Sequence, residues 1–216
     1  MTTIQNKLNE IAKCSVDKEG VTRYSFTKEH RKAISIITKW MTDAGLTVSM
    51  DDAGTLIGNL QSSNSQAKTL LLGSHQDTVK NGGKYDGIMG VLLSILALKN
   101  INKKKIHLPF NVQVLAFADE EGMRFPTSLL GSRALAGTLK KSFLGFKDKN
   151  NNTISDALKS FKLSPQKIMK LKRDKKKIIG FIETHIEQGP VLEKNNLPLG
   201  IVTAVSYTHL TLPTKA

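Results

Sequence analysis

The chain has 216 residues, a single cysteine and a formal net charge of +14. This length is enough to bury a hydrophobic core, and one cysteine excludes both an internal disulfide framework and a thiolate metal site. No run approaches the eighteen apolar residues of a membrane span, and the N-terminus lacks the basic-then-apolar order of a secretory signal. We therefore expect a cytoplasmic protein with no membrane partner.

The positive charge comes mainly from lysine. Two runs, at residues 102–107 and 167–177, carry much of the excess, with hardly any aromatic residues between the lysines and few arginines. Arginine is the better phosphate ligand, and nucleic-acid sites interleave basic and aromatic residues. We expect these lysines on solvated loops and helix faces, with no nucleic-acid partner. A basic nucleic-acid binder remains the alternative, and it predicts a steeply salt-sensitive affinity for DNA.

The first part of the chain alternates between predicted helices and strands. Residues 27–46 place apolar side chains at helical spacing and reach Gly45 near their end, which indicates an amphipathic helix. Residues 47–61 alternate around Asp-Asp-Ala-Gly and predict two short strands joined by a turn. An apolar strand, a buried helix and another apolar strand follow at residues 68–75, 87–100 and 110–118. Strands separated by helices indicate an α/β fold with a mostly parallel sheet flanked by helices.

The second part of the chain predicts one further informative strand among shorter elements. If the first half of residues 177–190 is a strand, its period of two places Glu183, His185 and Glu187 on one face. Helices are predicted at residues 131–139, 154–163 and 191–196, and a closing apolar strand at residues 196–205.

Polar clusters follow two of the predicted strands. GSHQD, at residues 73–77, and ADEEG, at residues 118–122, each come directly after an apolar run. Ligands of open α/β sheets bind beyond the carboxyl ends of the strands, so we expect the two clusters to share one crevice.

Three segments supply an oxygen and nitrogen donor set without thiolates: His75, Asp77, Asp86, Glu120, Glu121 and His185. Such a set suits Zn, Mn, Co or Ni, and one carboxylate can bridge two ions about 3.5–4 Å apart. Asp77 lies two residues after His75, so we expect its carboxylate to accept the second ring N–H of that histidine. Adjacent Glu120 and Glu121 point in different directions, which lets one bind metal while the other transfers protons.

Each of these features has a simpler interpretation when it is taken alone. A His-x-Asp pair is often a surface hydrogen bond, and Glu-Glu at a strand end is often a helix start. His185 alone is as well explained as a hydrogen-bonded core histidine. The glycine-rich loop before Asp86 is also typical of simple turns, or of phosphate binding, although it lacks the Gly-Lys-Ser/Thr ending of a nucleotide site.

Taken together, the three segments resemble a known family. GSHQDTVKNGGKYDGIMGVL, FADEEGMRFPTSLLGSRALAG and FIETHIEQGPVLE are similar to the signature stretches of the M20 metallopeptidase family. Within it they are most similar to the branch of allantoate amidohydrolases and N-carbamoyl-L-amino-acid hydrolases. The resemblance covers residues 25–205 and implies a zinc-exopeptidase-like catalytic domain, with a homodimer for the full-length protein.

The resemblance also implies a role for each matching residue. His75, Asp86 and His185 would hold one divalent ion, and Asp86 would bridge to a second ion held by Glu121. Glu120 matches the general base, and Asp77 matches the residue that orients His75. Gln188 matches a position near the substrate.

The function that the resemblance implies is hydrolysis of a C–N bond in a linear ureido compound. Glu120 would act as general base toward a water that bridges the two ions. Allantoate is the favoured substrate because EEGMRFPTSLLGSRALAG, at residues 120–137, looks most like that branch. N-carbamoyl-L-amino-acid hydrolase and β-ureidopropionase are the alternatives within the class. A metal-free binding protein of the same fold is a more distant alternative.

The resemblance gives expectations for domain organisation as well. Residues 1–205 correspond to the N-terminal part of the M20 catalytic domain, which would be incomplete. A second-metal histidine, the lid and dimerisation domain and the C-terminal part of the catalytic domain have no counterpart, so the truncated chain should be inactive. Residues 206–216, SYTHLTLPTKA, nearly match the translation of a transposase-type library adapter and are expected to be non-native.

Overall fold

The computed structural model of the protein describes residues 3–202. The chain divides into a main unit that ends at Ile186 and a smaller unit that begins at Glu187. The main unit contains a five-stranded sheet in the order β1-β2-β4-β3-β5. The strands are β1 (Thr47–Met50), β2 (Leu56–Leu60), β3 (Thr69–His75), β4 (Asn111–Phe117) and β5 (Ile178–Ile182).

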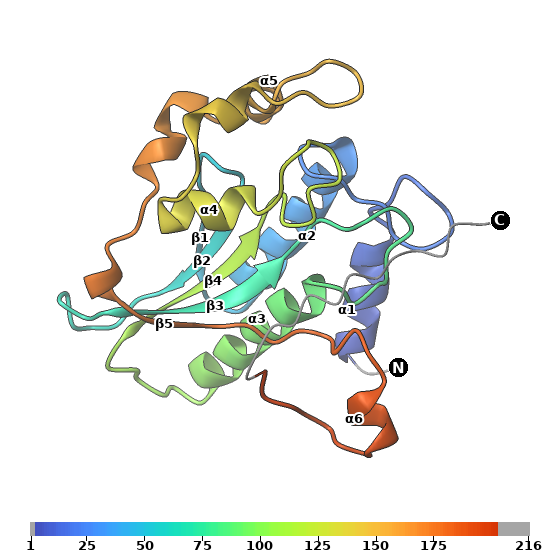
Figure 1. Cartoon of the computed structure of the whole chain (residues 1–216). Coiled ribbons are helices and arrows are strands. Elements are labelled where there is room, and N and C mark those ends of the chain that lie inside the picture. The colour runs from blue at the N-terminus through green and yellow to red at the C-terminus, as the bar shows by residue number, and fades with distance from the viewer. Residues whose placement is uncertain (1–2, 203–216) are drawn as a thin grey trace. The chain divides into compact units, whose positions relative to one another are not determined.

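The sheet has a parallel half and an antiparallel edge. β3 lies between β4 and β5 and runs parallel to both (Figure 1). The β1–β2 hairpin joins β4 through β2 in antiparallel pairing, with Leu56 opposite Ala116. The α/β architecture predicted from the sequence is confirmed, as are the two short strands joined by a turn.

Helices cover both faces of this sheet. α1 (Thr3–Ala12), α2 (Lys28–Asp43) and α3 (Ile88–Lys103) pack on one face, where their apolar residues form a cluster with Val112, Val114 and Ala116 of β4 (Figure 1). On the other face, Leu135 of α4 (Leu130–Ala136) contacts Leu115 and Phe117 of the same strand. The second half of β4 is therefore buried on both sides, as the continuous apolar run at residues 114–118 indicates.

Helix α2 shows how the local sequence produces these elements. The Thr27 hydroxyl accepts a hydrogen bond from the backbone N–H of His30, which caps the first turn. The buried side of α2 carries His30, Ala33, Ile37, Trp40 and Met41. This face largely follows the predicted apolar stripe. α1 was not among the elements predicted from the sequence.

His30 is completely buried in α2, and its Nδ1 accepts a hydrogen bond of 2.9 Å from the backbone N–H of Phe26. Burial, reinforced by the positive charge of Arg23, lowers the pKa of His30 to about 3. A histidine in the unfolded chain takes up a proton below about pH 6.5, whereas His30 in the folded chain stays neutral. The free energy of unfolding therefore falls as the pH drops below 6.5, by up to about 1.4 kcal/mol per pH unit for this one group.

His30→Asn keeps an acceptor for the Phe26 N–H and removes the titration. We expect the stability advantage of the wild type over this variant to shrink steadily between pH 7.5 and pH 5. Urea unfolding at several pH values measures this difference. An advantage that does not depend on pH would show that His30 is not held neutral.

The segment from residue 140 to residue 177, which we call the basic lobe, packs against the end of the sheet through its own apolar cluster. It contains η1 (Lys141–Gly145), α5 (Ile154–Ser160), η2 (Pro165–Lys170) and η3 (Lys175–Lys177). Ile154, Leu158 and Ile168 are fully buried in a cluster that also includes Leu130 of α4. α5 begins with a reciprocal capping box between Thr153 and Asp156.

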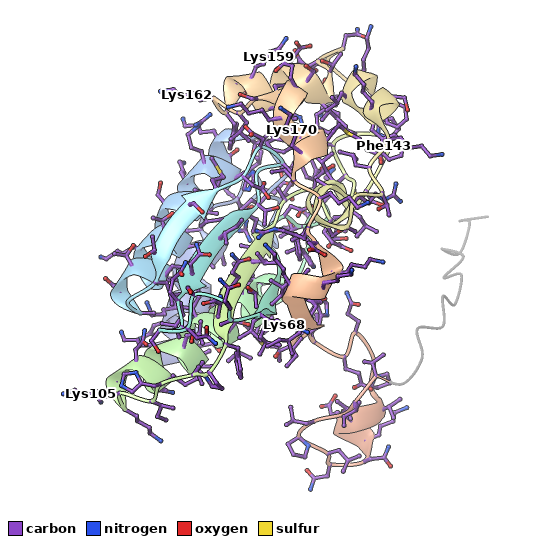
Figure 2. All side chains as sticks on the ribbon, turned by 90° about the vertical axis from the view of Figure 1, so that its left-hand side faces the viewer. Lys68, Lys105, Phe143, Lys159, Lys162 and Lys170 are labelled. Carbon is purple, nitrogen blue, oxygen red and sulfur yellow. The ribbon has the colours of Figure 1, made fainter. Side chains whose placement is uncertain are left out.

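The lobe carries most of the net positive charge of the chain. It holds thirteen lysine or arginine residues and three aspartates. Lys159, Lys162 and Lys170 project from the lobe, while Lys68 and Lys105 lie at the opposite end of the sheet (Figure 2). The lysines of both sequence runs are exposed, as predicted. The absence of a nucleic-acid partner stays a prediction.

The smaller unit contains α6 (Val191–Lys194), where a helix was predicted. The side chain of Glu187 accepts hydrogen bonds from the backbone N–H groups of Val191 and Leu192. Two predictions are wrong here. β5 ends at Ile182, so Glu183, His185 and Glu187 do not share a strand face. Of the closing strand predicted at residues 196–205, residues 196–202 form no strand, and the remaining three lie outside the described residues. The expectation for residues 206–216 lies outside the described residues.

Candidate metal centre

Three adjacent strands place the predicted donors. His75 is the last residue of β3, Glu120 and Glu121 follow β4, and His185 follows β5. β4, β3 and β5 are neighbours that run in the same direction, so their carboxyl ends lie at one edge of the sheet. The structure therefore brings the two polar clusters together, as the rule for open α/β sheets predicts.

The closest group consists of His75, Asp86 and His185. Asp86 lies in the loop between β3 and α3, and its Oδ1 is 3.0 Å from Nε2 of His185 and 3.6 Å from Nε2 of His75. The two imidazole rings are 5.7 Å apart between centroids. One nitrogen or oxygen atom from each of these three residues lies within 4.8 Å of the others.

In both histidines, Nε2 is the ring nitrogen that is available to a metal ion. Nδ1 of His75 is 2.9 Å from the carbonyl oxygen of Asp77, and Nδ1 of His185 is 2.9 Å from the carbonyl oxygen of Ile186. A carbonyl can only accept, so each Nδ1 carries the hydrogen when the ring is neutral. The Nε2 lone pairs are then directed toward Asp86, in the arrangement that metal-binding histidines normally show.

The role of Asp77 differs from the predicted contact. Its backbone carbonyl, not its carboxylate, faces the ring of His75. The carboxylate instead accepts hydrogen bonds of 3.1 Å from the backbone N–H groups of Glu120 and Glu121. The predicted carboxylate–imidazole bond is wrong because the side chain of Asp77 points toward the loop after β4. Asp77 thus links the β3 and β4 ends of the site.

Glu120 and Glu121 form a second group with His75. Nε2 of His75 is 3.9 Å from Oε2 of Glu120, and one donor atom from each of the three residues lies within 4.8 Å of the others. The simpler interpretation of this pair as a helix start is wrong, because the next helix, α4, begins only at Leu130. His185 is also not a core histidine, since 27% of its side chain is exposed and its Nε2 faces Asp86.

At Gly87, the glycine-rich loop passes close to the ring of His75. Its φ of +66° lies in the left-handed region, and a Cβ at this position would lie 2.4 Å from Cε1 of His75. Only glycine lets the loop after Asp86 pass this close to the imidazole before α3 begins. The phosphate-binding alternative for this loop gains no support, because its end faces an imidazole and a carboxylate.

The charges of the first group are strongly coupled. Burial alone lowers the pKa of His75, but the hydrogen bond to Asp86 and the charges of Asp77 and Glu120 outweigh burial and raise the pKa to about 9. The pKa of His185 is raised mainly by its hydrogen bond to Asp86. The hydrogen bonds from both histidines hold the pKa of Asp86 well below its usual range.

The same surroundings favour the uncharged form of the two glutamates. Burial raises the pKa of Glu121 to about 7 and also raises that of Glu120, while the positive charge of His75 opposes both shifts. In the metal-free chain, the positive charge of His75 therefore stabilises the charged form of the neighbouring carboxylates. A divalent cation fits this position because it supplies that charge and releases the protons. The N and O donors suit Zn, Mn, Co or Ni.

Sequence reasoning missed two polar groups beside this site. Asp119 is 1% exposed, and burial together with the charge of Asp77 raises its pKa to about 8. Ser74 is also buried and donates a 2.5 Å hydrogen bond to Glu183, beyond the last paired residues of β3 and β5. Both stand inside the quoted motifs, but their burial depends on tertiary packing that no local pattern encodes.

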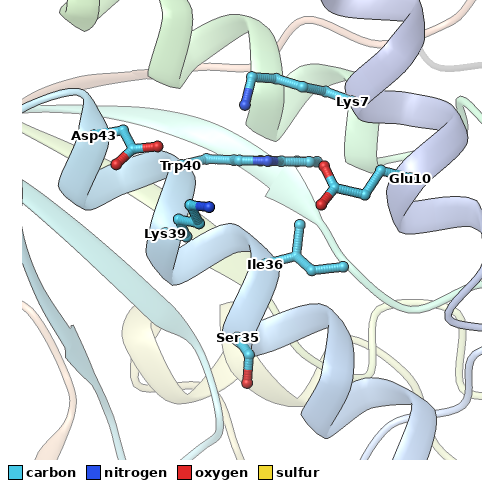
Figure 3. A pocket seen from close by; sticks show the side chains of 7 residues that line it. All are labelled: Lys7, Glu10, Ser35, Ile36, Lys39, Trp40 and Asp43. Carbon is cyan, nitrogen blue, oxygen red and sulfur yellow. The ribbon is translucent and has the colours of Figure 1, made fainter.

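A separate groove of 260 Å³ lies between α1 and α2 and contains none of the predicted site residues. Lys7 lies over the ring of Trp40, and Glu10, Lys39 and Asp43 line the same groove (Figure 3). Trp40 is only 3% exposed, so its ring offers almost no surface to a ligand. The donor cluster at the strand ends is the stronger functional site.

The fold and the donor cluster together define an α/β domain with the ligand set of a divalent-metal site at the carboxyl ends of its parallel strands. Comparison with known proteins then gives the family. The sequence pattern of peptidase family M20/M25/M40 matches residues 71–214. The chain belongs to this family, as the resemblance of its motifs predicted.

Several relatives are similar over most of this chain. Allantoate deiminase 2 of Glycine max is 42% identical over 204 residues, which are 93% of this chain and 42% of that protein. N-carbamoyl-L-amino acid amidohydrolase of Geobacillus stearothermophilus is 41% identical over 187 residues, which are 87% of this chain and 46% of that protein. A hydantoinase/carbamoylase family amidase from Burkholderia ambifaria superposes with a TM-score of 0.81 at 30% identity, over 89% of this chain and 46% of that one. The chain thus spans somewhat less than half the length of these relatives.

Proposed function

We propose that this chain carries the metal-binding part of an amidohydrolase that cleaves a C–N bond of a linear ureido compound, with two divalent ions as cofactors. The observation that carries the proposal is the convergence of His75, Asp86 and His185 with Glu120 and Glu121 at the ends of three adjacent strands. The names of the relatives, a deiminase and an amidohydrolase, support the same reaction class.

The residues of the site divide into ligands and a proton carrier. His75, Asp86 and His185 would hold one ion, and Asp86 with Glu121 would hold the second. Bound divalent cations lower the pKa of water and polarise a carbonyl oxygen. Glu120 takes the proton of the attacking water as the new C–O bond forms, and it delivers that proton to the departing nitrogen as the C–N bond breaks. The raised pKa of Glu120 makes it a better proton acceptor near neutral pH.

Allantoate is the proposed substrate, and an N-carbamoyl-L-amino acid is the second candidate. Relatives named for each activity have nearly the same identity to this chain, 42% and 41%. Gln188 is proposed to contact the substrate. It belongs to the smaller unit, so this role stays a prediction.

The whole protein is proposed to be a cytoplasmic homodimer. No helix within residues 3–202 is both long and apolar enough to cross a membrane.

The assay that tests this proposal compares substrates directly. The whole protein, loaded with Mn²⁺, is incubated separately with allantoate, an N-carbamoyl-L-amino acid and N-carbamoyl-β-alanine, and ammonia release is measured. We expect the largest kcat/KM for allantoate. A larger kcat/KM for a carbamoyl amino acid would make that compound the substrate within the same reaction class. If none of the three compounds releases ammonia, the proposed amidohydrolase activity is refuted.

A further inference from the structure

The loop that joins β4 to α4 carries both glutamates of the site, and two other residues of this loop have an unfavourable backbone conformation. Asp119, directly before the pair, has a φ of 59°, and Leu129, at the other end of the loop, has a φ of 62°. Residues with a side chain rarely adopt this left-handed region, and a conformation of this kind persists only where surrounding contacts impose it. The position of Glu120 and Glu121 therefore depends on contacts made elsewhere.

The carboxylate of Asp77 supplies the first of these contacts, through the backbone N–H groups of Glu120 and Glu121. The second comes from Arg124, three residues beyond Glu121. Its Nη1 donates to the carbonyl oxygens of Ser25, at 2.9 Å, and Phe26, at 2.6 Å. Arg124 thus ties the far side of the loop to the segment that leads into α2.

The same guanidinium also reaches into the basic lobe. Nε and Nη2 of Arg124 both lie 3.1 Å from Oδ2 of Asp148. Only 17% of the arginine side chain and 4% of the aspartate side chain are exposed. A charge-assisted pair that is this well shielded from water holds its geometry far better than a surface ion pair does.

Asp148 is itself held by its own turn. Its Oδ1 accepts hydrogen bonds from the backbone N–H groups of Asn150, at 2.9 Å, and Asn152, at 3.0 Å. Each carboxylate oxygen therefore has a separate task, one within the turn and one toward Arg124. This turn belongs to the lobe, so the lobe holds Arg124 in a fixed direction.

We infer that Arg124 and Asp148 are a positioning pair through which the basic lobe fixes the loop that carries Glu120 and Glu121. Neither residue contacts the donor atoms of the site. Their effect passes through the loop backbone to the two amides bonded to Asp77. The inference rests on the proposed function only in giving these glutamates a role in metal binding.

Hydrogen exchange of the metal-free chain of 216 residues tests the inference without any metal. In the wild type, the amides of Glu120 and Glu121 should be protected by Asp77. We expect Arg124→Gln to accelerate their exchange at least tenfold relative to amides in the middle of β4. Asp148→Asn keeps the oxygen that the turn uses and removes the charge, so it should act in the same direction. The double variant should add little.

Arg31→Gln is the matched control. Nη2 of Arg31 donates to the carbonyl oxygen of Ser160, and its guanidinium lies 4.0 Å from the ring of Phe161. Arg31 therefore also anchors the lobe, but it makes no contact with the loop after β4. We expect this control to change the exchange of the two amides less than twofold. Arg124→Lys keeps the charge without the planar fork and should give an intermediate rate.

Zn²⁺ binding to the same variants supplies a second readout. We expect Arg124→Gln to weaken Zn²⁺ affinity at least tenfold and Arg31→Gln to leave it within twofold. If Arg124→Gln does not fold, Arg124→Lys and Asp148→Asn decide by the same two measurements. Unchanged exchange at Glu120 and Glu121, or equal effects of Arg124→Gln and Arg31→Gln, would overturn the inference. A wild-type chain that binds no Zn²⁺ would refute the proposed function. The exchange rates of the Glu120 and Glu121 amides would still show whether Arg124 and Asp148 position this loop.

Discussion

Asp86→Asn is expected to abolish specific metal binding by this chain. A single oxygen of Asp86 faces both histidines, at 3.0 Å and 3.6 Å. An amide at this position is neutral and binds a cation far more weakly than a carboxylate does. The substitution also removes the negative charge that orients both imidazoles. No other carboxylate among residues 3–202 belongs to a donor group with both histidines.

Thermal unfolding with and without Mn²⁺ or Zn²⁺ measures this loss. Metal at one hundred times its Kd stabilises the folded chain by about 2.7 kcal/mol. For a protein of this size, that corresponds to a rise in Tm of about 5–10 °C. We expect this rise for the wild type and none for Asp86→Asn.

Asp43→Asn is the matched control. Asp43 is exposed at the end of α2 and lies far in sequence from His75, Asp86 and His185. It should retain the full rise in Tm. If Asp86→Asn retains the rise as well, the metal binds elsewhere. A wild type without any rise would instead favour a metal-free binding protein of the same fold.

Glu120→Gln and Glu121→Gln should have opposite consequences in the whole protein. Glu120→Gln removes the proton acceptor and keeps the shape of the side chain, so metal content should stay near normal while kcat falls by a factor on the order of 10²–10⁴. Glu121→Gln removes a proposed ligand of the second ion, so metal content itself should drop. The two residues are adjacent, which makes each the natural control for the other.

Metal analysis after dialysis, combined with the ammonia assay, separates these outcomes. Loss of metal from Glu120→Gln with retention in Glu121→Gln would mean that the two roles are exchanged. The geometry makes this a real test, because Oε2 of Glu120 lies only 3.9 Å from Nε2 of His75. Normal turnover in both variants would contradict the assignment of this pair altogether.

Much of this arrangement could be predicted because the relevant patterns are local. The strand that ends at His75 and the one that precedes Glu120 each contain a short continuous apolar run, which is typical of buried parallel strands. Parallel neighbours end at the same edge of a sheet, so motifs at two strand ends meet without any knowledge of tertiary contacts. The structure does bring these residues together at one edge of the sheet.

The predictions that the structure contradicts concern side-chain directions in irregular segments. Asp77 lies beyond the end of β3, where strand alternation no longer fixes orientation, and its carboxylate turns to the loop after β4. The same reason applies to residues 183–187, which follow the end of β5. Arg124 and Asp148 are 24 residues apart, and nothing in the local sequence indicates that they form a buried pair.

Anomalous diffraction from crystals of this chain grown with Zn²⁺ shows whether His75, Asp86 and His185 form one metal site. We predict an anomalous peak within about 2.0–2.2 Å of Nε2 of His75, Nε2 of His185 and an oxygen of Asp86. An ordered zinc ion bound away from these three atoms, or histidine rings whose Nε2 atoms turn away from Asp86, would contradict it.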